Sequence, residues 1–349
     1  MHRPRWFASA LTILLAATGT VALAATPAQA ALPDVVGFVL WNGSVVASGT
    51  RPAATSVTGT TVKTITFPGL AAGGGVVHVT AINDTARWCQ VLKFFPSGPD
   101  EIVDVACFAT GGAVVVTAFS AIFESSSPPA GPINGRFGYV DTAATGAIIS
   151  QFNSSGAVNG AGMISSGVYT VKMPALSTAG PTDGSVQATA VNSSVPARCK
   201  VYKWSSSPSG QLIQVNCYDA TGTPLSTEFT LTYQYQQSLY GAGWPPRFGY
   251  LWNMPPAGPV STNFNSVSGP GANTVAVVGT GLYQVIFKNL AVLPDDVQVT
   301  AVGSGSDYCN MVVGWSASGS DTIVKAVACY TNAGMRTPGG FTVSDNSAF

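Results

Sequence analysis

Hydrophobic and polar residues alternate in short runs along this chain, and the best-matched run occurs three times. It reads Val-His-Val-Thr-Ala-Ile at residues 77–82, Val-Gln-Ala-Thr-Ala-Val at residues 186–191 and Val-Gln-Val-Thr-Ala-Val at residues 297–302. Such alternation is typical of a strand with one face on a core and the other on solvent. The pattern predicts one equivalent half-buried strand in each of three repeats.

Other segments align in the same register. The second and third repeats open with Arg-Phe-Gly-Tyr at residues 136–139 and 247–250, and the first has a looser version at residues 37–42. Short strands are expected in the second repeat near residues 137–142, 146–153, 167–173, 185–192, 198–205, 211–218 and 227–235. This density of strands, without a convincing helix, predicts an all-β fold of three tandem β-sandwich domains with about seven strands each.

Each repeat contains two cysteines, and the midpoint of each pair falls in a turn rich in Pro, Ser and Gly. Residues equidistant from a hairpin turn face each other across the two strands, within the range that a disulfide accepts. An even number of cysteines without metal-ligand spacing favours structural bridges. We predict one bridge inside each hairpin, worth about 3 kcal/mol in the chain-entropy model: Cys89–Cys107, Cys199–Cys217 and Cys309–Cys329.

Residues 1–30 have the features of a secretory signal peptide. Arg3 and Arg5 precede an apolar run, and Ala-Gln-Ala at residues 28–30 fits a cleavage site. No later run is apolar and long enough to cross a bilayer, so we expect an exported extracellular protein without membrane insertion. The predicted domains span residues 31–127, 133–238 and 247–349, and proline-rich segments at 125–132 and 240–246 are expected to act as stiff spacers.

The repeats resemble domain-sized tandem repeats, with an FGY-like opening, a VQVTA-like strand and a cysteine hairpin, that recur in secreted actinobacterial proteins of unknown function. The resemblance covers nearly all of residues 36–349. It implies three domains and export, and it brings no activity with it. The first repeat departs most, because its opening is looser and it has an extra glycine-rich turn at residues 73–75.

Charge excludes nucleic acid as an expected partner. Removal of the signal peptide leaves 13 basic residues against 15 acidic ones, whereas phosphate binding needs a concentrated basic face. Charged residues make up only 9% of the chain and hydrophobic residues 46%. The abundant Val, Ile and aromatic residues supply the buried surface that disordered chains lack.

Candidate catalytic residues are few. The single histidine of the mature chain, His78, aligns with Gln187 and Gln298, and we interpret this position as an exposed polar site on a strand. Glycoside hydrolysis needs only two carboxylates, but the acidic residues do not recur in register, and most lie in turn-like sequence. Asp295 and Asp296 are interpreted as a turn that offers only a weak calcium site. We expect no catalytic residue, metal or cofactor.

Aromatic residues are the one recurrent feature with binding character. An exposed ring beside amide and hydroxyl groups is how a sugar-binding surface is built, and core packing is the alternative interpretation. Phe94 and Trp204 lie an odd number of residues from their cysteines, which places them on the face of the hairpin opposite the bridge. The candidate ligand-binding residues are Phe94, Trp204, Trp315, Trp41, Tyr139 and Trp252.

These observations favour a non-enzymatic secreted protein that binds an extracellular or cell-wall polymer such as a glycan. Three copies of a weak site would gain avidity on such a polymer. One alternative is a structural, coat-like protein whose neutral surface packs against copies of itself. The other is a hydrolase with a single carboxylate-based active domain.

Overall fold

A computed structural model describes residues 34–51, 53–127, 135–241, 247–255 and 258–347, without side chains at 258–261. The predicted signal peptide lies outside these residues. The described chain is all-β, as predicted, and none of its residues forms a helix that is long and apolar enough to cross a membrane.

Each repeat folds into two groups of strands, which we call the opening half and the cysteine half. In the first repeat the opening half is β1 (Val35–Trp41), β2 (Val46–Gly49), β5 (Val76–Ile82) and β9 (Ala118–Ser125). Its cysteine half is β3 (Ser56–Thr58), β4 (Lys63–Phe67), β6 (Arg87–Ser97), β7 (Asp100–Ala109) and β8 (Val114–Val115). Buried residues of the two halves share one apolar core, which confirms a sandwich.

The second and third repeats follow the same order. The second has an opening half of β10 (Arg136–Thr142), β11 (Ile148–Asn153), β14 (Ser185–Val191) and β17 (Glu228–Tyr235), and a cysteine half of β12 (Gly160–Ser165), β13 (Val168–Pro174), β15 (Ala197–Ser207) and β16 (Gly210–Asp219). The third has an opening half of β18 (Phe248–Met254), β19 (Gly258–Asn265), β22 (Asp295–Val302) and β26 (Gly340–Ser347), and a cysteine half of β20 (Thr274–Gly279), β21 (Leu282–Phe287), β23 (Tyr308–Met311), β24 (Ser316–Ser318) and β25 (Asp321–Tyr330). The sequence analysis missed β12, because this mostly exposed strand has little apolar alternation.

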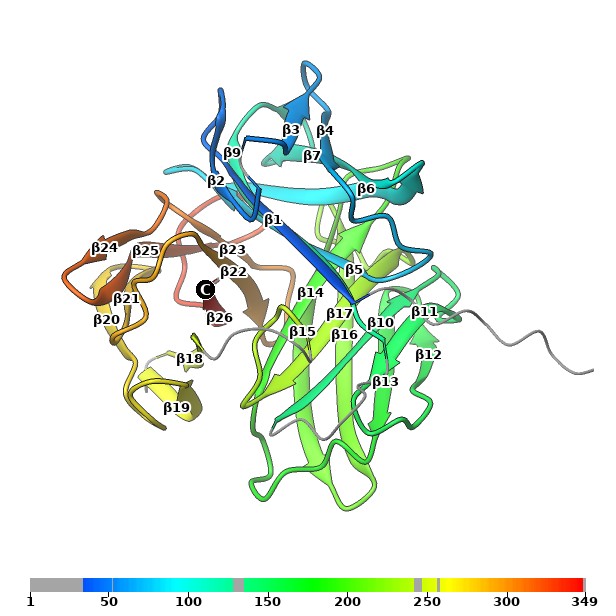
Figure 1. Cartoon of the computed structure of the whole chain (residues 1–349), viewed down its shortest axis with the longest axis vertical. Coiled ribbons are helices and arrows are strands. Elements are labelled where there is room, and N and C mark those ends of the chain that lie inside the picture. Colours follow the sequence, from blue (N-terminus) through cyan, green and yellow to red (C-terminus); the bar gives the residue numbers. More distant parts are fainter. Residues whose placement is uncertain (1–33, 52, 128–134, 242–246, 256–257, 348–349) are drawn as a thin grey trace, which may run out of the picture. The chain divides into compact units, whose positions relative to one another are not determined.

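The expectation that each repeat is a self-contained sheet structure is wrong. Each of three sheets joins the opening half of one repeat to the cysteine half of another (Figure 1). Repeat 2 joins repeat 1 through a parallel pair of Val191 with Val91, repeat 3 joins repeat 2 through Val302 with Val201, and repeat 1 joins repeat 3 through Ile82 with Met311. The connections therefore close in a cycle. The boundaries at residues 31–127, 133–238 and 247–349 remain predictions, because the sheet connections do not test them.

The three central strands β5, β14 and β22 contact one another and are buried along their whole length. His78 is only 3% exposed, and its counterparts Gln187 and Gln298 are 1% exposed, so the interpretation of this position as a surface site is wrong. The ring nitrogens of His78 lie 3.3 Å from Thr189 Oγ1 and 2.8 Å from Thr232 Oγ1. Alternation alone identified one buried face, whereas the neighbouring repeats cover the other.

Threonine hydroxyls connect these strands. The Val79 N–H donates to Thr189 Oγ1 at 3.4 Å, the Ala188 N–H to Thr300 Oγ1 at 3.1 Å, and the Val299 N–H to Thr80 Oγ1 at 2.9 Å. These bonds run from repeat 1 to 2, from 2 to 3 and from 3 to 1. Each central strand thus provides a hydroxyl acceptor for one backbone N–H group of a neighbouring central strand, and this N–H group has no acceptor in its own sheet.

The predicted disulfides are confirmed. Cys89 and Cys107, Cys199 and Cys217, and Cys309 and Cys329 are paired residues of one hairpin each, with Cα atoms 4.0 Å apart. Every described cysteine is bonded, which indicates an oxidising compartment.

The predicted orientation of the hairpin aromatics is wrong, because a β-bulge follows the first cysteine of two hairpins. The pairing shifts by one residue between Val91 and Lys93, and between Val201 and Lys203. A bulge adds a residue to one strand and reverses which face later side chains occupy. Phe94 and Trp204 therefore lie on the same face as the disulfides and contact the core.

The predicted spacers lie largely outside the described residues. Tyr240, at the edge of the second one, is fully buried and stacks on Phe38 with ring centroids 5.7 Å apart. Its hydroxyl donates to the Asn346 carbonyl at 2.5 Å. Tyr240 therefore packs in an apolar cluster with the first repeat and is hydrogen-bonded to the third.

Candidate functional site

The six aromatic residues proposed for ligand binding do not form a repeated exposed surface. Trp41, Tyr139 and Trp204 are at most 3% exposed. The half-buried residues Phe94, Trp252 and Trp315 pack against the three sandwich cores. Most of the surface of these six rings is used for packing, so the interpretation as core residues fits them better than the interpretation as ligand-binding residues.

The three places where an opening half meets a cysteine half have different side chains, although they are equivalent in register. Between repeats 2 and 3, Trp252 packs on Trp204 with ring centroids 4.7 Å apart. Between repeats 3 and 1, Leu40 and Ala118 pack with Trp315 on an apolar core. The packed positions of these two junctions are therefore mainly apolar, although Trp315 also donates its Nε1–H to Asp295 Oδ1 at 2.6 Å.

The junction between repeats 1 and 2 is acidic. Asp141 aligns with Trp252 and Leu40, and Glu228 aligns with Gly340 and Ala118. The third carboxyl group comes from Glu101 of β7, whose counterparts in the other hairpins are the uncharged Gln211 and Thr322. The three carboxyl groups are particular to this junction.

These carboxyl groups line a hollow of about 330 Å³, which we call the acidic groove. Aromatic rings from the tip of the β6–β7 hairpin form part of its wall. Phe95 is 38% exposed, and Phe94 lies beside it. The remaining lining residues are Ala72, Gly73, Gly74, Pro96, Ile149 and Ser150.

The extra glycine turn of the first repeat positions one side of the acidic groove. Gly75 has a φ of +123°, and its N–H donates to Ser150 Oγ of repeat 2 at 3.0 Å. A Cβ added to Gly75 would lie 2.5 Å from the Glu124 carbonyl oxygen. Only glycine tolerates this φ and this close approach without strain. The glycine turn in which the first repeat departs from the others is thus part of the groove wall, through Gly73 and Gly74.

Burial dominates the electrostatics of the groove. It raises the pKa of Glu101 to about 7, although the Ala72 N–H donates to Glu101 Oε2 at 3.2 Å and opposes the shift. It raises the pKa of Asp141 to about 8, with a further contribution from the nearby Glu228 carboxylate. Glu228 is half-buried, and burial raises its pKa also. Glu101 Oε1 and Asp141 Oδ1 are buried and lack hydrogen-bond partners among the described residues.

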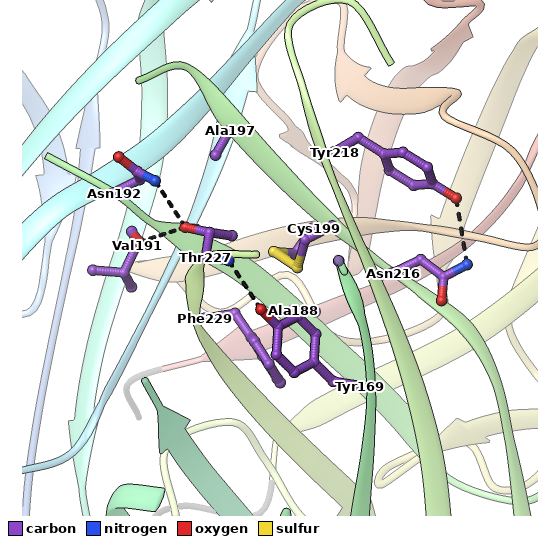
Figure 2. Close-up of a disulfide and its surroundings, with 12 residues drawn as sticks. Tyr169, Ala188, Val191, Asn192, Ala197, Cys199, Asn216, Tyr218, Thr227 and Phe229 are labelled. Atoms are coloured by element: carbon purple, nitrogen blue, oxygen red, sulfur yellow. Dashed lines mark hydrogen bonds between the residues drawn. A yellow bond between two sulfur atoms is a disulfide. The ribbon is translucent and has the colours of Figure 1, made fainter. Parts of the chain in front are cut away.

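A second hollow of about 390 Å³ shares Phe94 and Glu228 with the acidic groove. Its wall includes Asn192 and Thr227, which Figure 2 shows bonded to each other near the Cys199 disulfide. The Asn192 amide donates to Thr227 Oγ1 at 3.0 Å, and that hydroxyl donates to the Val191 carbonyl at 2.9 Å. The two hollows together offer an extended surface of rings, amides and carboxyl groups.

No protein-family model, curated protein or solved structure matches the chain. The structure supports one part of the resemblance drawn from the sequence: the chain has three β-sheet repeats with one disulfide each.

Sequence reasoning missed the acidic groove. Most acidic residues were interpreted as turn formers, whereas Glu101 belongs to β7 and Glu228 begins β17, close to the start of the strand expected near residues 227–235. A signal was present in β10, where the charged Asp141 directly follows a run of aromatic and apolar residues. Asp295 and Asp296, interpreted as a turn, instead begin the buried strand β22. The described residues contain no group of three His, Cys, Asp or Glu side chains that could hold a metal ion.

Proposed function

We propose that this protein is exported and binds an extracellular glycan in the acidic groove. The observation that carries the proposal is the difference between the three junctions: two are mainly apolar, and the third is hollow and lined by aromatic rings and carboxyl groups. Sugars present C–H faces that pack on aromatic rings and hydroxyl groups that donate to carboxylates. The three disulfides and the signal-peptide pattern support export.

Binding to insoluble polysaccharides, followed by titration calorimetry with soluble fragments of the retained polymer, tests this proposal. The Phe95→Ala variant is expected to bind at least about 10-fold more weakly, because it removes an exposed ring from the groove wall. Leu212→Ala is the matched control, since Leu212 is 49% exposed on the equivalent hairpin of repeat 2. Equal loss in both variants, or unchanged binding by Phe95→Ala, would contradict the proposed site.

The raised pKa values of Glu101 and Asp141 in one hollow favour a second candidate function, glycoside hydrolysis. That reaction needs one protonated carboxyl group as acid and one ionised carboxylate as base or nucleophile. Asp141 would serve as the acid beside an ionised Glu228.

Release of reducing ends from the polysaccharide that binds is the measurement. Asp141→Asn is expected to lower the rate at least about 100-fold, because general acid catalysis contributes on that order. If the unaltered protein binds the polymer but releases no reducing ends, the hydrolase hypothesis is rejected and the binding proposal remains.

A further inference from the structure

We propose that the ligand of the acidic groove carries a positive charge and is an amino sugar with a free amine. This inference rests on the proposed glycan-binding function and specifies the chemical class of the glycan. It follows from the charge of the groove, from the unpartnered oxygens in it and from the spread of its carboxyl groups.

The charge of the groove is one-sided. Three carboxyl groups line it, and no lysine or arginine is among its lining residues in the described chain. Lys93 lines the second hollow, which shares Phe94 and Glu228 with the groove. Its ammonium group lies 3.5 Å from Asp104 Oδ2 and 4.9 Å from the centre of the Phe95 ring. Lys93 is therefore engaged at the rim, and it leaves Glu101 and Asp141 without a cation.

The unpartnered oxygens point to a missing partner. Glu101 is fully buried and Asp141 is 4% exposed, yet one carboxyl oxygen of each lacks a hydrogen bond in the described structure. Natural proteins seldom leave buried polar atoms without a partner, because their desolvation is then uncompensated. At the equivalent position of repeat 2, Gln211 is neutral: its amide donates to the Leu176 carbonyl at 3.0 Å, and only its uncharged Oε1 lacks a partner among the described residues. A ligand with several ammonium groups would supply donors and countercharge to these carboxyl groups.

The spread of these groups favours an amine on a larger molecule over a bare ion. The described residues contain no cluster of three side chains that could hold one metal ion, so the carboxyl groups act at separate points of the hollow. A sugar amine has a charged donor that can reach the carboxyl groups while the sugar ring packs on Phe94 or Phe95. An oligolysine peptide has the charge without that ring.

Because burial raises the pKa of Glu101 to about 7 and that of Asp141 to about 8, binding of ammonium groups must be accompanied by loss of the carboxyl protons. The test therefore uses titration calorimetry of the full mature chain at pH 7 and low ionic strength with three probes. These are a glucosamine tetramer, the N-acetylglucosamine tetramer of the same length and a lysine tetramer. We expect the glucosamine tetramer to bind at least about 10-fold more tightly than the acetylated one, as a charge-assisted hydrogen bond requires. Raising the salt concentration should weaken binding of the glucosamine tetramer and leave binding of the N-acetylglucosamine tetramer nearly unchanged.

Variants assign the preference to the groove. In Glu101→Gln, which installs the side chain that repeat 2 has, and in Asp141→Asn, the affinity ratio of the two tetramers should fall to about one. The ratio is taken on one protein sample, so a smaller folded fraction does not change it. Asp84→Asn removes the same charge from an exposed site in repeat 1 and should keep the preference.

Each failure has a separate meaning. Equal binding of both tetramers overturns the amino-sugar inference and leaves glycan binding in place. Tighter binding of the lysine tetramer also overturns it, because the ring would then contribute nothing. If neither tetramer binds and no polysaccharide retains the protein, the proposed function itself is wrong.

Discussion

Replacing Thr80, Thr189 and Thr300 together by valine is expected to lower the free energy of unfolding by about 6 kcal/mol, roughly 2 kcal/mol for each site. Valine has the shape of threonine and is more apolar, so simple burial arguments predict a gain. Here the loss dominates, because each substitution leaves a buried backbone N–H of the next central strand without an acceptor. Since a domain is stable by only about 5–15 kcal/mol, most of the molecule's stability would disappear.

Urea denaturation followed by tryptophan fluorescence measures this effect. The triple serine variant is the matched control, because it keeps the three hydroxyl acceptors and loses one methyl group at each position, whereas valine keeps the methyl groups and loses the hydroxyls. We expect it to be clearly more stable than the triple valine variant. If valine were equal to or better than serine, the threonine bonds would not hold the three repeats together.

The second large effect is an unusual dependence of stability on pH. Asp296 is fully buried, and burial raises its pKa to about 7. Ser120 and Gln298 donate to Asp296 Oδ1 and oppose this shift, while Oδ2 lacks a partner among the described residues. A folded pKa above the unfolded one contributes stability that is complete below about pH 4 and is lost as the pH rises towards 7.

The neighbours of Asp296 act in the same direction. Burial raises the pKa of Asp295 to about 6 and that of Asp345 well above its usual range. Burial also raises the pKa of the nearby Tyr240 hydroxyl. Asp295 aligns with Gly75 of the first repeat and Gly184 of the second, and Asp345 aligns with Phe123 and Tyr233. In these two repeats the glycine faces the aromatic ring. The third repeat therefore has two carboxyl groups where the others have glycine and an aromatic ring.

His78 opposes this trend. Burial lowers its pKa to about 3, so its contribution is present above about pH 6.5 and is lost as the pH falls below that value. Between pH 6.5 and 5 the histidine costs about 2 kcal/mol, whereas Asp296 alone regains about 3 kcal/mol between pH 7 and 5. The other buried carboxyl groups add to the latter. We expect the greatest stability near pH 4, because the carboxyl contributions together exceed the cost of the histidine down to that pH.

Unfolding measured by denaturant from pH 4 to 8 checks this expectation. Asp296→Asn should flatten the decline between pH 5 and 7, and His78→Gln, which installs the residue of the other two repeats, should raise stability at pH 5. Asp84→Asn, at an exposed position, should leave the profile unchanged. A profile that rises from pH 5 to 8 in the unaltered protein would contradict the assignment.

The sequence predicted what depends on local pattern. Cysteines equidistant from a turn gave the bridges, and alternation located the strand at residues 186–191. It could not predict which sheet that strand joins, because alternation reports burial and not the identity of the neighbour. The same limit explains His78: a polar residue that alternates with valine looks exposed until another repeat covers it.

The errors at the candidate site have equally specific causes. One extra residue in the bulge after Val91 and one after Val201 reversed the predicted orientation of Phe94 and Trp204. The acidic groove combines Glu101 with Asp141 and Glu228, which are distant in sequence and meet only because strands are exchanged between repeats. Single-sequence periodicity contains no information on such a meeting.

The cyclic connection of the repeats fixes their copy number. Each repeat has one opening half and one cysteine half, and after three the last half is already joined to the first. A fourth copy would find no partner at these joins, unlike in a solenoid, where units are added without limit. Among the described residues, three carboxyl groups line a hollow at the join between repeats 1 and 2 alone, so one chain would be monovalent if the acidic groove binds a glycan as proposed. Multivalent attachment to a polymer would then require several molecules acting together.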